Sequence, residues 1–126
     1  MTVLLRLFAW LLAAAVAFAT LGPPDTRPHS DLGQDGEHAL AFVLVGLAFG
    51  LAYSQRRRIS SAIAVVLIGV LELLQLVAPG RHARLEDFVV DALAAGAGFA
   101  LSAALEWGFT RVRAGFGTIT RNGPAE

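Results

Sequence analysis

The sequence contains no cysteine, its ten basic residues are all arginine, and charged residues make up only 16% of its 126 residues. Without cysteine, disulfide bonds, thiol nucleophiles and cysteine-ligated zinc are excluded. Without lysine, Schiff-base chemistry through a side-chain amine is excluded. The formal net charge is zero, so no basic surface for nucleic acid is indicated and no nucleic-acid partner is expected.

Hydrophobic residues are abundant, at 56% of the chain with a mean hydropathy of +0.62, a balance typical of a membrane protein. Four apolar stretches approach the roughly 20 residues that a helix needs to cross a bilayer, and none has a polar face wide enough for a helix in water. These predicted helices cover residues 3–21, 37–53, 59–78 and 88–109.

The predicted fold class is therefore all-α, a four-helix transmembrane bundle with both termini cytoplasmic. It forms one domain over residues 1–113, followed by a short flexible cytoplasmic tail over residues 114–126. The first apolar stretch has an alternative interpretation. Arg6, the apolar run after it and the triplet Ala17-Phe18-Ala19 also resemble a signal peptide cleaved after Ala19.

The orientation follows from the arginines, which membrane proteins concentrate on the cytoplasmic side. In the four-helix interpretation three arginines fall on one side of the membrane, namely Arg27, Arg81 and Arg84. Seven fall on the other side, namely Arg6, Arg56, Arg57, Arg58, Arg111, Arg113 and Arg121. The side with seven is predicted to be cytoplasmic, with Trp10, Tyr53 and Trp107 as interfacial anchors and Glu106 paired to an arginine.

A glutamate stands inside the third apolar stretch. Glu72 lies six residues before residue 78, about 9 Å below the outer end of its helix. An acid at that depth costs up to about 3 kcal/mol on insertion, so it should be paired, protonated or in contact with water. Gln75 shares its helix face at i, i+3, and Arg81 or His38 is the expected charged partner. A purely structural hydrogen bond to Gln75 is the alternative.

A second polar face opens the fourth stretch. Asp87 and Asp91 are i, i+4 on one face, which the small residues Ala94, Gly98 and Ser102 continue inward. Small residues in this pattern let a neighbouring membrane helix approach closely. This stripe is therefore predicted to face another helix rather than lipid.

The second stretch carries Gly46-x-x-x-Gly50, another close-packing pattern, and begins at Glu37-His38. A bundle that turns these faces inward would bring the polar residues around one outward-opening pocket, with Arg81 and Arg84 at its rim. Glu72 and Asp87 are candidate catalytic bases, and no metal or cofactor is expected. The candidate binding residues are His38, Glu72, Gln75, Arg81, Asp87 and Asp91.

The motifs around this pocket resemble the VanZ-like family of small bacterial membrane proteins. They comprise Glu72-x-x-Gln75, Pro79-Gly80-Arg81, Asp87-x-x-x-Asp91 with Gly96 and Gly98, and His38 followed by Ala41-Phe42. The resemblance implies a four-helix, multi-pass protein of the bacterial inner membrane. The family's namesake is associated with resistance to the glycopeptide antibiotic teicoplanin.

Three functions are compatible with these residues. The first is binding of a lipid or a lipid-linked cell-wall precursor, with Arg81 and Arg84 meeting its phosphate. The second is a membrane-embedded hydrolase or transferase, with Glu72 or Asp87 as base or with His38, Asp87 and Asp91 around a metal ion. The third is a proton-coupled transporter subunit that titrates at Glu72 and assembles as a homo-oligomer.

Overall fold

The computed structural model describes residues 2–22, 33–77 and 85–119, and all regular structure in these residues is helical. The elements are α1 (Thr2–Leu21), α2 (Gly33–Ala52), the 3-10 turn η2 (Ser54–Arg56), α3 (Arg57–Gln75) and α4 (Leu85–Ile119). The predicted all-α class with four helices is confirmed.

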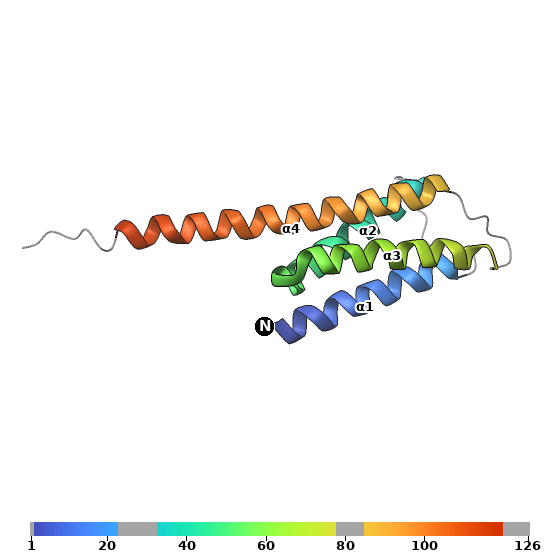
Figure 1. Cartoon of the computed structure of the whole chain (residues 1–126), viewed down its shortest axis with the longest axis horizontal. Coiled ribbons are helices and arrows are strands. Elements are labelled where there is room, and N and C mark those ends of the chain that lie inside the picture. Colours follow the sequence, from blue (N-terminus) through green and yellow to red (C-terminus); the bar gives the residue numbers. More distant parts are fainter. Residues whose placement is uncertain (1, 23–32, 78–84, 120–126) are drawn as a thin grey trace, which may run out of the picture.

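Helices that follow one another in the sequence run in opposite directions (Figure 1). The start of α1, the end of α2 and the start of α3 therefore lie at one end of the molecule, and α4 extends past them there. We call this the basic end, because it carries Arg6, Arg56, Arg57, Arg58, Arg111 and Arg113. We call the opposite end the acidic end, because it carries Glu37, Glu72, Glu86, Asp87 and Asp91.

The helix boundaries differ most from the prediction at the end of α4. The predicted segment stopped at residue 109, before the charged residues Arg111 and Arg113, but α4 continues to Ile119. A charged residue ends an apolar run in the sequence but does not have to end the helix, because arginine is a good helix former. Residues 114–119 of the predicted tail therefore belong to α4, and residues 120–126 lie outside the described part of the chain.

Three helices are long and apolar enough to cross a membrane. These spans are Val3–Leu21, Ser54–Gln75 and Leu85–Ala114, with mean hydropathies of 2.1, 1.7 and 1.8. The apolar part of α2, Gly36–Ala52, is shorter. It falls short of the length of α2 because that helix begins with the polar residues Gln34 and Asp35.

Large apolar side chains cover the outside of the helices. Leu4 on α1, Val66 on α3 and Leu93 on α4 are 72%, 65% and 69% exposed. Apolar exposure on this scale would promote association in water, whereas a bilayer would cover it with acyl chains. The outer surface therefore suits lipid.

The inside of the bundle is built from small residues, and its most extensive contact joins α2 to α4. A Cβ atom added at Gly46 would collide with the carbonyl oxygen of Ala95, and one at Gly98 with the backbone of Val43. A Cβ at Gly50 would lie 2.7 Å from the Cβ of Ser102. Backbone approaches backbone because side-chain volume is missing, which confirms the packing prediction for the Gly46/Gly50 pattern and for the stripe on α4.

Helix α1 packs less closely against the other helices. Its Ala9 is buried and clusters with Ala48 and Ala52 of α2. Beside this contact, a mainly apolar cavity of about 520 Å³ lies between α1, α2 and α3. Alanines such as Ala13 and Ala17 leave this space because they are too short to reach α3.

Aromatic and charged side chains interact at the basic end. The indole Nε1 of Trp10 donates a hydrogen bond of 3.1 Å to the Tyr53 hydroxyl, and Arg6 lies 5.0 Å from the Tyr53 ring centroid. The Arg111 guanidinium lies 4.0 Å from the centroid of Trp107. Aromatic rings with cationic neighbours near one end of the helices are typical of a membrane interface.

Candidate functional site

Buried polar residues of α3 lie near the acidic end. Glu72 and Gln75 are each only 7% exposed, and the Gln75 amide Nε2 donates a hydrogen bond of 3.1 Å to Glu72 Oε2. The i, i+3 spacing places both side chains on one face of the helix. Gln75 is therefore a hydrogen-bond partner of Glu72, and this bond is the one that the structural interpretation of the sequence predicted.

Asp91 of α4 is the second buried acid, at 4% exposed. The charges of Glu72 and Asp87 both act on its carboxyl group, so α3 and α4 bring three carboxyl groups into one neighbourhood. Asp87 lies one turn nearer the helix start and is half-buried. The structure thus brings together four of the predicted binding residues, Glu72, Gln75, Asp87 and Asp91.

Apolar side chains pack next to these acids, on the side that faces the middle of the bundle. Phe42 of α2, Ile68 of α3 and Ala95 of α4 form one buried cluster, with Phe88 packed against it. A Cβ at Gly69 would touch the Phe88 ring at 3.4 Å, so the glycine gives the ring room against α3. The cluster lies one helical turn from Glu72 along α3 and from Asp91 along α4, on the side away from the acidic end.

His38 lies on α2 one helical turn before Phe42, toward the acidic end. The side chain is half-buried, and its ring centroid is 6.4 Å from that of Phe42. His38 therefore meets the cluster through the aromatic ring of Phe42. The prediction that it pairs with Glu72 has no hydrogen bond or ion pair to support it within the residues that the structure describes.

The predicted rim of the pocket falls outside the described residues. Arg81 and Arg84 belong to the segment between α3 and α4, of which residues 78–84 are not described. Their roles as partner of Glu72 and as phosphate ligands stay predictions.

The acids do not form a metal site in the described chain. Within residues 2–22, 33–77 and 85–119, no group of three His, Asp or Glu side chains is placed to hold a metal ion. The interpretation of His38, Asp87 and Asp91 as metal ligands therefore gains no support from the structure.

Thr20, a residue to which the sequence gave no role, is buried at the acidic end of α1. It is 1% exposed, and its hydroxyl oxygen has no hydrogen-bond partner among the described residues. Threonine is common inside apolar stretches, so the sequence gave no reason to single out Thr20, and only its burial in the structure does so.

The arrangement suits binding of hydrogen-bond donors. Carboxylates accept hydrogen bonds and attract positive charge, and the Gln75 amide can also accept through its oxygen. A group that carries hydroxyl or amino functions would satisfy these acceptors without adding negative charge.

In comparisons with known proteins, no family model matches the chain, and neither a curated protein nor a solved structure matches it.

Proposed function

We propose that this chain is a VanZ-like protein of the bacterial inner membrane that binds the polar head group of a lipid or of a lipid-linked cell-wall precursor at its acidic end. The observation that carries the proposal is the joint burial of Glu72, Gln75 and Asp91 near one end of helices that are apolar enough to span a membrane. The resemblance of the motifs between residues 72 and 98 to the family supports it. A link to glycopeptide resistance belongs to the same proposal.

The energetics favour a functional role for the acids. A buried carboxylate costs several kcal/mol unless hydrogen bonds or opposite charges compensate it. Gln75 supplies one hydrogen bond to Glu72. Asp91 instead has two further acids as neighbours, which raise the cost of a negative charge there. A bundle that needed only stability would be better served by apolar residues at these positions.

A proton-coupled transporter is the second candidate, because Glu72 and Asp91 are buried acids on facing helices. Such acids mark proton pathways in many membrane proteins. This function predicts pH-driven flux in sealed vesicles. Head-group binding requires no such flux.

The proposal includes an orientation, with four membrane crossings and the basic end in the cytoplasm. It can be tested by labelling, because the chain contains no cysteine and a single introduced thiol has no background. Gln55→Cys at the basic end and Glu86→Cys at the acidic end both replace exposed residues. In intact cells, a membrane-impermeant maleimide is expected to label Glu86→Cys and to reach Gln55→Cys only after permeabilisation. Labelling of Gln55→Cys in intact cells would reverse the orientation.

The binding function is tested by the lipids that the protein retains. The protein is purified in a mild non-ionic detergent, and its bound lipids are extracted and compared by mass spectrometry with those of the whole membrane. We expect enrichment of a species whose head group carries hydroxyl or amino groups. Bound lipid with the same composition as the bulk membrane would refute selective head-group binding.

A further inference from the structure

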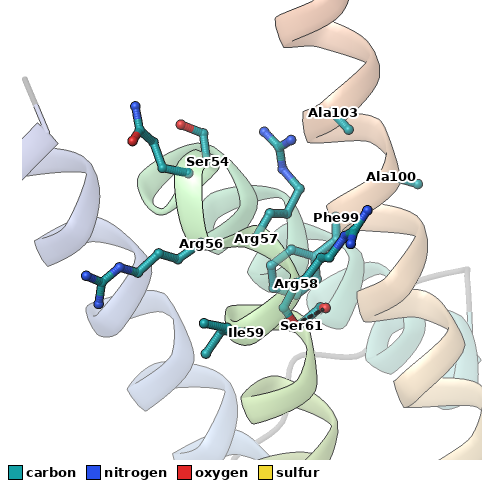
Figure 2. Close-up of a pocket in the computed structure, with 10 residues that line it drawn as sticks. Ser54, Arg56, Arg57, Arg58, Ile59, Ser61, Phe99, Ala100 and Ala103 are labelled. Atoms are coloured by element: carbon teal, nitrogen blue, oxygen red, sulfur yellow. Dashed lines mark hydrogen bonds between the residues drawn. The ribbon is translucent and has the colours of Figure 1, made fainter.

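The basic end contains a cavity that the proposed function does not use. It has a volume of about 650 Å³, within the range of ligand sites, and lies between the start of α3 and the middle of α4 (Figure 2). On the side of α3 it is lined by Arg56, Arg57 and Arg58, together with Ser54 and Ser61.

Three consecutive arginines give this cavity its charge. Figure 2 shows Arg57 and Arg58 extending toward α4 and Arg56 extending toward α1. One of the three is neutralised, since Nη2 of Arg57 lies 2.5 Å from Oε2 of Glu106, as the predicted pairing of Glu106 required. Within the residues that the structure describes, Arg56 and Arg58 make no ion pair, so positive charge remains for an anion.

The polar groups around the cavity include a donor without an acceptor. Nε of Arg57 is buried and has no hydrogen-bond partner among the described residues, although its guanidinium already contacts Glu106. No side chain caps the N-terminus of α3, where backbone N–H groups and the helix dipole favour negative charge. A buried N–H group without an acceptor, next to a helix start without a cap, offers hydrogen bonds that an anionic oxygen would accept.

The remaining wall of the cavity is apolar. Ile59, Phe99 and two alanines of α4, Ala100 and Ala103, line it, and the alanines make room because their side chains are short. The candidate span of α3 begins at Ser54, so the arginines stand at the end of a membrane-crossing segment. A ligand in this cavity would therefore place its head group against arginine and its apolar portion against the apolar side chains.

We propose that this cavity binds the phosphate group of an anionic ligand, supplied either by a phospholipid head group or by free phosphate. Arginine holds phosphate by paired hydrogen bonds, and basic pockets at the cytoplasmic face of membrane helices bind anionic lipids. If the arginines served only to fix topology, they would need neither a cavity nor an apolar wall. This site is independent of the acidic end.

The test measures equilibrium binding to the full chain in an uncharged detergent. The probes are short-chain phosphatidylglycerol, short-chain phosphatidylcholine and inorganic phosphate. A lipid site is expected to bind phosphatidylglycerol saturably and at least about tenfold more tightly than either other probe. A site for free phosphate is expected to bind inorganic phosphate as tightly as phosphatidylglycerol. Absence of saturable binding of both anions would overturn the proposal.

Two variants with opposite expected effects locate the binding. Arg58→Gln removes a charge from the cavity and should weaken binding about fivefold, as loss of one cation near a membrane surface does. Glu106→Gln releases Arg57 from its ion pair and should tighten binding, which a misfolded variant would not do. Arg113→Gln removes the same charge from an exposed site on α4 outside the cavity and is the matched control. Equal weakening by Arg58→Gln and Arg113→Gln would show that only the overall charge of the basic end matters.

Discussion

Replacing Gly98 by leucine is expected to prevent the four helices from assembling. A Cβ at this position would lie 2.6 Å from the backbone nitrogen of Leu47 and would also collide with the carbonyl oxygen of Val43. These are backbone atoms of α2 and cannot swing aside, so the two helices must separate. Overpacking usually costs about 1–3 kcal/mol where side chains can move, and we expect a loss of about 3 kcal/mol or more here.

The matched control for this change is two residues away on the same helix. Gly96 is exposed, and a Cβ there meets no atom within 4 Å. Gly96→Leu should therefore keep or slightly raise stability, because leucine is the better helix former. Thermal unfolding in detergent compares the two variants, with the exposed change Leu101→Phe as a second control. Equal stability of Gly98→Leu and Gly96→Leu would show that α2 and α4 do not approach as closely as described.

Glu72→Gln is expected to abolish function while leaving the fold intact. The Gln75 amide can donate to the carbonyl oxygen of a glutamine as it now donates to Glu72. The substitution also removes a buried charge from beside Asp91. The free energy of unfolding should therefore stay equal or rise by about 1–3 kcal/mol. A residue whose isosteric replacement stabilises the protein but removes its function is one that binding requires.

Two measurements separate this outcome from a structural role. Membrane level and thermal stability show whether the variant folds, and the amount of the enriched lipid that it retains on purification shows whether it still binds as proposed. Glu72→Ala should differ from Glu72→Gln by losing about 1–3 kcal/mol of stability, because it leaves the Gln75 amide unpaired. Normal function of a well-expressed Glu72→Gln variant would leave Glu72 a structural residue.

The number of helices and the inward face of α4 could be predicted from the sequence. The length of an apolar run indicates whether its helix is long enough to cross a bilayer. Small residues at helical spacing indicate where the backbone of another helix approaches. Gly98 and Ser102 are buried for this reason, as are Gly46 and Gly50 opposite them. The end of α4 could not be predicted, since polarity alone does not distinguish a helix that leaves the membrane from a tail.

The candidate site could be predicted only in part. The i, i+3 pairing of Glu72 with Gln75 is local and depends on helix geometry alone. The approach of Asp91 to Glu72 depends on how α3 packs against α4, and the sequence indicated it only on the assumption that both polar helix faces turn inward. The contact of His38 with Phe42 is also local, because the two residues are i, i+4 on α2.

The cavity at the basic end was not predicted from the sequence, because arginines at the end of a membrane-spanning helix are already explained by their role in setting its orientation. The cavity depends on Ala100 and Ala103, more than forty residues away from Arg56–Arg58 in the sequence. Only the packing of α3 against α4 brings the two groups together. The serines on either side of the arginines, Ser54 and Ser61, were the one local sign of a polar recess.

The occupancy of the acidic end by a retained lipid tests the central claim most directly. Native mass spectrometry of the wild-type protein, Glu72→Gln and Glu86→Gln counts the enriched lipid on each. Glu86→Gln makes the same chemical change at an exposed position of the same end. The predicted result is equal occupancy for the wild type and Glu86→Gln, and occupancy at least about tenfold lower for Glu72→Gln, a loss expected for a buried charged hydrogen-bond partner. Equal occupancy in all three proteins would contradict the assignment of Glu72 to a head-group site.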